Sequence, residues 1–279
     1  LKRLAGIDAA RLSPANRVNY AIYREQIDNF VAGQKFQAWQ MPFNSDSAFW
    51  SDLGYVLGGD RLRTAADYQR YLDRLGQVPA YFDQQIANMR AGLRRGFSVP
   101  RAVLDGRDAS IAAVAELKDP TRSSFYEPFR QLPASIPADR AQALQGRALR
   151  QIRDEVIPAY AKLLAFFRNE YVPQARTTLA AEALPDGKAF YRQQIREYTT
   201  LELGPDEIHQ IGLDQVAKIH AQMLEVMQET GFKGSFAGFL TFLRTDPQFY
   251  AKTADELLMR SAWVAKQVDG QMPRYFGHL

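Results

Sequence analysis

Residues 136–172 read "IPADRAQALQGRALRQIRDEVIPAYAKLLAFFRNEYV" and carry the pattern that decides the fold class. Proline is tolerated in the first turn of a helix, so Pro137 marks the start of a long helical stretch. A second proline, Pro158, lies inside the stretch, where it removes a backbone donor and clashes with the preceding turn. We therefore predict a long helix with a kink or a break after Ile157.

Further helix starts lie on both sides of this stretch. A helix N-terminus is typically capped by a side-chain oxygen that accepts a hydrogen bond from a free backbone N–H. The sequence offers such caps at Ser13, Thr64 and Thr253. Residues 64–96 predict two helices, the second opened by Pro79, and we expect them to form an α-hairpin.

Strand signals are weak by comparison. No Asn-Gly or Asp-Gly turn joins alternating apolar runs, and no repeat or linker divides the chain. We therefore expect a mainly α fold over residues 1–279. It should be a single domain of long kinked helices joined by aromatic-rich loops, with little or no β-structure. The aromatic side chains of residues 33–60 are expected to pack between helices rather than to bind a ligand.

Composition limits the class of function. Of 279 residues, 46% are hydrophobic and 24% are charged, so the chain can bury a sizeable core. The net charge of +4 comes from 35 basic and 31 acidic residues without strong clustering, so we expect no nucleic-acid partner. The chain has no cysteine, which excludes disulfides, thiol catalysis and cysteine-bound metals.

Targeting signals are absent from the sequence. No apolar run approaches the roughly 20 residues that a membrane-spanning helix needs, and no signal peptide is present. The chain begins with Leu1 rather than methionine, so we expect that an N-terminal segment has been removed. An export signal would be lost in this way.

Residues 198–223, "YTTLELGPDEIHQIGLDQVAKIHAQM", contain two of the three histidines. Pro205 and the acidic residues after it predict the start of a helix, and the wide apolar arc of this helix predicts that it is largely surrounded by protein. His209 and His220 are eleven residues apart, or roughly 16 Å along the helix axis, which is too far for both to bind one metal ion. We expect each to be a boundary residue with one hydrogen bond.

Hydroxyl groups gather just before this helix. Tyr191, Tyr198, Thr199 and Thr200 lie at the junction ahead of it, where loop residues held by rigid elements often meet ligands. These four residues and His209 are candidates for a substrate cleft, with helix capping and packing as the alternative. No phosphate loop, dinucleotide fingerprint, nucleophile elbow or His-Glu-x-x-His motif is present. We therefore expect no catalytic residue, metal ligand set or cofactor in this chain.

A series of short motifs runs through residues 184–223, "LPDGKAFYRQQIREYTTLELGPDEIHQIGLDQVAKIHAQM". They are a Pro-x-Gly turn, a tyrosine, Tyr-Thr-Thr, and a Pro-x-Glu-Ile-His helix with a following Gly-Leu, at positions 185–187, 191, 198–200, 205–209 and 212–213. In this order they resemble the bacterial family known as domain of unknown function 885. Residues 71–104 and 242–258 are similar to two further segments of that family, so the resemblance spans nearly the whole chain.

The resemblance implies a mainly helical, zinc-dependent, peptidase-like protein of about twice this length that is often exported. Its metal-binding segment, similar to His-Glu-x-x-Pro-Gly-His-His, lies in the C-terminal half. This sequence departs from that pattern because it ends at "MPRYFGHL", so no zinc ligand carries over and His278 matches none of the motif. Zinc is therefore expected only in the full-length protein. The implied location is periplasmic or exported, with the cytoplasm left open.

Two hypotheses remain. In the first, the chain is the N-terminal scaffold and substrate-cleft portion of a zinc metallopeptidase-like hydrolase, inactive alone, with the C-terminal half of the same protein as its partner and a peptide as substrate. In the second, it is a self-contained α-helical module that binds peptides or another protein. A cut after Leu279 would expose an apolar patch around Trp263 and Tyr275, whereas a smooth polar surface there would favour the second hypothesis.

Overall fold

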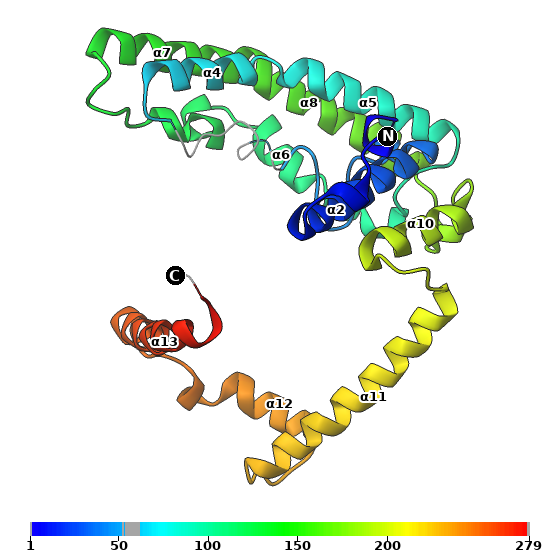
Figure 1. The fold of residues 1–279 in the computed structure, drawn as a ribbon. Helices are drawn as coiled ribbons and strands as arrows, with labels where there is room; N and C mark the ends of the chain where they lie inside the picture. The colour runs from blue at the N-terminus through cyan, green and yellow to red at the C-terminus, as the bar shows by residue number, and fades with distance from the viewer. Residues whose placement is uncertain (1, 52, 54–61, 278–279) are drawn as a thin grey trace. The chain divides into compact units, whose positions relative to one another are not determined.

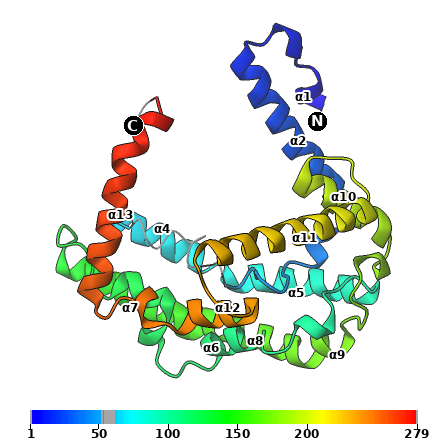
Figure 2. The same ribbon diagram turned by 90° about the horizontal axis from the view of Figure 1, so that it is seen from below.

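The computed structural model of the protein describes residues 2–51, 53 and 62–277. Helices account for nearly all regular structure in these ranges, and the predicted mainly α fold is confirmed. The described residues form no β-sheet, and their isolated β-bridge joins Phe43 to Ala48. The chain divides into two compact units, Leu1–Leu203 and Gly204–Leu279, whose helices are drawn in Figures 1 and 2. This division leaves the single-domain prediction untested.

The helices of each unit have the following bounds. The first unit contains α1 (Lys2–Ala5), α2 (Pro14–Lys35), α4 (Ala65–Leu75), α5 (Val78–Arg94), α6 (Ala109–Ala115), α7 (Ala138–Gln151), α8 (Ile157–Phe166), α9 (Val172–Gln174) and α10 (Gly187–Thr199). Among its described residues, the short 3₁₀ helices are Ala9–Arg11, Ala38–Gln40, Arg101–Val103, Pro120–Arg122, Ser124–Phe129 and Ala181–Ala183. The second unit contains α11 (Pro205–Glu229), α12 (Phe236–Thr245), a 3₁₀ turn at Pro247–Phe249, and α13 (Ala254–Tyr275). No helix in the described ranges is long and apolar enough to cross a membrane.

The predicted helix caps are confirmed. Ser13 Oγ accepts a hydrogen bond from the Asn16 N–H, 3.3 Å away, at the start of α2. Thr64 and Thr253 accept the equivalent bonds at the starts of α4 and α13. These bonds satisfy backbone donors that the first turn of a helix would otherwise leave free.

The long stretch opened by Pro137 forms one continuous helical rod rather than a broken helix. Two π turns, Ile152–Val156 and Phe167–Tyr171, join α7, α8 and α9. Each π turn is followed by a proline at the second position of the next α-helical segment, Pro158 or Pro173. In each turn a backbone N–H donates a hydrogen bond to the carbonyl five residues earlier. The proline that follows has no N–H, so it leaves no donor without a partner. The helix does not break after Ile157, because the wider turn lets it pass the proline, and the alternative of a kink there stays a prediction.

Helices α4 and α5 lie along this rod, one after the other, instead of forming the expected hairpin (Figure 1). α4 packs against α7, and α5 packs against α8. The two residues between them, Gly76 and Gln77, both keep right-handed helical backbone angles, so the chain does not reverse direction. The hairpin prediction fails because a helix boundary in a sequence does not reveal the angle between the helices that it separates.

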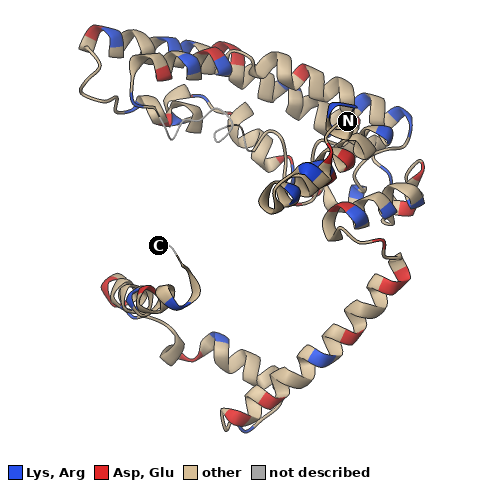
Figure 3. Cartoon of the chain, in the orientation of Figure 1, with Lys and Arg blue, Asp and Glu red and all other residues tan. Residues whose placement is uncertain are grey.

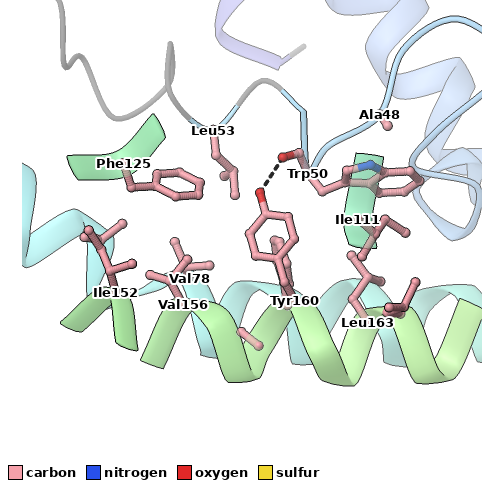
Figure 4. Close-up of a cluster of buried hydrophobic side chains, with 14 of the residues drawn as sticks. Ala48, Trp50, Leu53, Val78, Ile111, Phe125, Ile152, Val156, Tyr160 and Leu163 are labelled. Atoms are coloured by element: carbon pink, nitrogen blue, oxygen red, sulfur yellow. Dashed lines mark hydrogen bonds between the residues drawn. The ribbon is translucent and has the colours of Figure 1, made fainter. Parts of the chain in front are cut away.

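The core of the first unit lies between the rod, α5, α6 and the aromatic loop that follows α2 (Figure 4). The hydroxyl of Tyr160 on α8 donates a hydrogen bond of 2.6 Å to the backbone carbonyl of Trp50, and the Trp50 indole N–H donates to Ser110 Oγ at 3.0 Å. Phe43 and Trp50 are buried and pack against Phe167. The packing role predicted for the aromatic loop is confirmed for its described part, while residues 52 and 54–60 lie outside the described ranges.

The second unit has almost no core of its own. Phe239 on α12 is its one buried side chain among residues 204–277. The predicted burial of α11 is wrong, since its apolar residues Ile211, Leu213, Val216, Ile219, Met223 and Val226 are all exposed. His220 is also exposed, and its ring packs edge-on against Phe236, with the ring centroids 5.3 Å apart. An apolar arc shows which side of a helix avoids water, but it does not show what covers that side.

Candidate functional site

The candidate site is a groove between α2 and α10, which pack against each other within the first unit. Gln193 on α10 donates a 3.1 Å hydrogen bond from Nε2 to Oδ1 of Asn29 on α2, across 164 residues of sequence. Three residues further along α10, Arg196 Nε lies 3.5 Å from a carboxylate oxygen of Glu25, which is four residues earlier on α2. The two helices therefore run antiparallel along the groove.

An aromatic cluster closes one end of the groove. The rings of Phe36 and Phe190 lie 5.6 Å apart in an edge-to-face arrangement, and Phe97 packs against Phe190 at 5.5 Å. Edge-to-face aromatic pairs add a small directional term to the free energy gained from burying their area. Together with Leu184 these residues form a small core that is separate from the main one. This core fixes α10 against the end of α2.

The start of α10 depends on a close backbone approach. Asp186 adopts a left-handed conformation with φ of 56°, and the helix begins at Gly187. A Cβ atom at position 187 would lie 2.4 Å from the backbone oxygen of Ala181, so only glycine fits there.

The groove has a volume of about 520 Å³, which lies in the range of small-molecule sites. Charged, amide and apolar side chains line it. The lining residues are Asp28, Asn29, Ala32 and Lys35 from α2, Phe36 directly after it, Ala189, Arg192, Gln193 and Arg196 from α10, and Glu202. On each helix these residues follow the i, i+3, i+4 spacing of a single face. Acidic and basic residues occur on both helices (Figure 3).

Arg196 organises one end of the groove. Its guanidinium lies between two carboxylates, pairing with Glu25 through Nε and with Glu202 through Nη1. The Asn29 side chain also donates to Glu25, at 3.4 Å. This network holds the carboxylates and amides in place and leaves Arg196 with little capacity for a further ligand.

Two of the candidates from sequence, Tyr191 and Tyr198, lie on a different side of α10 from the groove. The helix turns by about 100° per residue, which places their side chains together and well away from Gln193 and Arg196. Tyr198 is 83% exposed and Tyr191 is 41% exposed. The structure brings these two tyrosines to one surface of the first unit, and their role in a substrate cleft stays a prediction.

The two threonines form the end of α10. Thr199 Oγ1 donates a 2.7 Å hydrogen bond to the Ile195 carbonyl and accepts one of 3.1 Å from the Leu201 N–H. Thr200 adopts a left-handed conformation with φ of 59°, and its N–H bonds to the Arg196 carbonyl at 2.7 Å. A β-branched residue rarely takes this conformation, and such strain often marks a functional segment. Both threonines terminate the helix, while a contact between either one and a substrate is untested.

The fifth candidate, His209, is exposed on α11 in the second unit. Within the described ranges, no group of three or more His, Asp or Glu side chains is arranged to hold a metal ion, so these residues do not fit a zinc centre. His278 lies outside the described ranges. The absence of metal ligands in the chain as a whole stays a prediction.

Sequence reasoning missed the groove. On α2 and directly after it, residues 28, 29, 32, 35 and 36 share one face, and on α10 residues 189, 192, 193 and 196 do the same, so each half of the signal is present in the sequence. The pairing of these two faces across 164 residues cannot be read from periodicity.

The second unit has a hollow of its own. It lies between α11 and α12, has a volume of about 310 Å³, and is lined almost entirely by apolar side chains, including Ile219, Met223 and Phe239.

Comparison with known proteins identifies the family. No curated protein matches the chain. A crystal structure described as that of "the putative lipoprotein from Colwellia psychrerythraea" matches 85% of this chain with a TM-score of 0.77 and 24% identity, which shows a shared fold. The match covers 42% of that structure's chain, so the present chain spans about two fifths of its length. The model of the family "Bacterial protein of unknown function (DUF885)" matches residues 1–279, and the chain therefore belongs to the DUF885 family.

Proposed function

We propose that this chain is the N-terminal scaffold and substrate-cleft portion of a larger zinc-dependent peptidase, and that it has no activity without the rest of that protein. The resemblance of residues 184–223 to the family pattern is the source of the peptidase assignment. An exported location is part of the same proposal, and the lipoprotein description of the structural neighbour supports it.

The observation that carries the proposal is the uncovered apolar surface of the second unit. Exposed large apolar side chains lie along both long helices of this unit, α11 and α13. On α13 they are Leu257, Leu258, Met259, Trp263, Val264, Val268 and Tyr275. Burying one such side chain typically stabilises a protein by about 1.5–3 kcal/mol, so a surface of this kind is typical of an interface. We propose that the remaining part of the longer protein covers it.

In this proposal the remaining part of the protein holds the zinc, and this chain contacts the substrate. Zinc bound in the remaining part would supply Lewis-acid polarisation of the scissile carbonyl and of the attacking water. The residues of this chain would orient the peptide, with Tyr198 as the best candidate because its hydroxyl is free to meet a substrate.

The test compares this chain with the product of the complete gene. Both are given a peptide library, and the zinc content of both is measured after dialysis. The proposal predicts cleavage and about one zinc per molecule for the complete product, and neither for this chain. A complete gene product without zinc and without cleavage would contradict it. Peptide binding by this chain alone, in the apolar hollow between α11 and α12, would favour the self-contained binding module instead.

A pair of variants in the complete product tests the cleft. Tyr198→Phe should lower turnover with little loss of stability if the hydroxyl contacts the substrate. Thr199→Ala should lower stability by about 0.5–1.5 kcal/mol and leave the turnover of the folded fraction unchanged, because its hydroxyl bonds only to the backbone. Unchanged kinetics for Tyr198→Phe would remove Tyr198 from the cleft.

A further inference from the structure

The groove between α2 and α10 contains two cations that are not engaged by carboxylates. Among the described residues, no carboxylate forms an ion pair with Lys35 or Arg192, whereas Arg196 in the same groove is paired with Glu25 and Glu202. The Lys35 ammonium lies 5.8 Å from the centre of the Phe36 ring. Asp28, the other acidic residue of the lining besides Glu202, forms an ion pair of 3.6 Å with Arg24, so neither carboxylate of the lining is paired with Lys35 or Arg192.

The antiparallel packing places the two free cations in the same stretch of the groove. Arg192 precedes Gln193, which bonds to Asn29, and follows Phe190, which packs on Phe36. Lys35 is the residue before Phe36 on α2. Both cations thus belong to the part of the groove between the amide contact and the aromatic contact.

Three apolar side chains line the groove together with these cations. Phe36 is 7% exposed and is held by Phe190, and Ala32 and Ala189 supply the small side chains that leave the groove open. An arginine guanidinium presents parallel N–H groups that match the two oxygens of a carboxylate, and a lysine adds a second positive charge. The combination suits a ligand with a carboxylate at one end and an apolar group beside it.

We infer that this groove binds a small carboxylate ligand, with the carboxylate on Arg192 and Lys35 and its apolar part against Phe36. The inference goes beyond the proposed function, because it requires neither zinc nor peptide cleavage and concerns residues of the first unit alone. A free organic acid and the C-terminal end of a short peptide share this chemistry.

Calorimetric titration of this chain with matched probes tests the inference. N-acetylphenylalanine should bind, whereas N-acetylphenylalanine amide, which lacks the charge, should bind at least about tenfold more weakly, since charge-assisted hydrogen bonds are roughly twice as strong as neutral ones. A tripeptide that ends in phenylalanine identifies the source: tighter binding than N-acetylphenylalanine indicates a peptide terminus, and equal binding indicates a free acid.

Variants locate the site. Arg192→Gln and Lys35→Gln should each weaken binding of N-acetylphenylalanine by about tenfold or more, while Arg17→Gln, an exposed arginine on α2 outside the groove, should leave it unchanged. Thermal unfolding of each variant checks that the fold is retained. Equal binding of acid and amide, full affinity in both groove variants, or phosphate binding as tight as that of the acid would each overturn the inference.

Discussion

The two units of this chain use apolar side chains in opposite ways. In the first unit, Leu163, Phe82 and Phe129 are fully buried in a core that joins the rod to α5 and the aromatic loop. In the second unit, Leu258 is 69% exposed and Trp263 is 63% exposed, although both lie on a regular, well-capped helix. Regular helices can therefore form without a buried core. The second unit has such helices and almost no core, which is the pattern expected of a surface that another segment covers.

The largest expected difference between the units comes from one substitution made in each. Leu163→Ala should lower the free energy of unfolding by about 2–5 kcal/mol, because it leaves a cavity in the core. Leu258→Ala should change it by less than about 0.5 kcal/mol, because the side chain is already in water. Guanidinium unfolding followed by circular dichroism measures both. Similar losses for the two variants would show that the second unit has a core of its own.

Alkaline pH should also act on the first unit. Burial raises the pKa of Tyr171 to about 12, above its ordinary value of 10.0, and burial raises the pKa of Tyr71 and Tyr160 in the same direction. Unfolded phenols ionise at lower pH than these folded ones, so the stability they contribute is complete below pH 10 and is lost as pH rises towards 12. For Tyr171 a pKa difference of about two corresponds to roughly 3 kcal/mol.

The measurement is tyrosinate absorbance followed together with helical circular dichroism. The buried Tyr71, Tyr160 and Tyr171 should ionise only above the ordinary phenol pKa, together with the loss of helical signal as the first unit unfolds. Ionisation of Tyr160 and Tyr171 near the ordinary phenol pKa, with the helical signal intact, would contradict the burial described for the rod.

A smaller effect is expected from one buried hydroxyl. Tyr160→Phe should lower the free energy of unfolding by about 1–3 kcal/mol, because the Trp50 carbonyl would lose its donor inside the core. Tyr198→Phe, on the exposed side of α10, is the matched control and should change stability by less than about 0.5 kcal/mol. Equal stabilities of the two variants would mean that the Trp50 carbonyl accepts a hydrogen bond from water once the Tyr160 hydroxyl is removed.

The smallest effect is expected where the first unit ends. Thr200→Gly should raise the free energy of unfolding by about 0.5–1 kcal/mol, because glycine takes the left-handed conformation without the strain of a β-branched side chain, although it loses more entropy on folding. A thermal melt measures this difference. A lower stability for the glycine variant would indicate that the Thr200 side chain makes a stabilising contact that outweighs the strain.

Local features of the fold are predictable from the sequence, and long-range ones are not. The caps at Ser13, Thr64 and Thr253 are readable because each depends on residues within one turn. The continuation of the helical rod past Pro158 could not be predicted from the sequence, because a proline inside a helix can be accommodated by a π turn or can end the helix. The groove was missed for a related reason, because its two walls meet across 164 residues.

For the candidate residues, the sequence indicated the right junction but not the use of each side chain. The Thr199 hydroxyl bonds to the backbone at the end of α10, which is the capping role that the sequence had left as an alternative, whereas Thr200 bonds there through its backbone N–H. Tyr198 keeps a free hydroxyl on the surface. Residue type alone does not separate a hydroxyl that caps a helix from one that meets a ligand, because both require a polar side chain at a helix end.

Hydrogen–deuterium exchange of the backbone amides tests most directly the claim that the second unit lacks a core and is completed by the rest of the protein. In this chain alone, amides of α7 and α8 should exchange slowly and those of α11 and α13 quickly, because local opening is easiest where few apolar groups are buried. In the complete gene product, α11 and α13 should become protected while α7 and α8 stay as they were. Equal protection of the two units in this chain alone, or unchanged fast exchange of α11 and α13 in the complete product, would contradict the account.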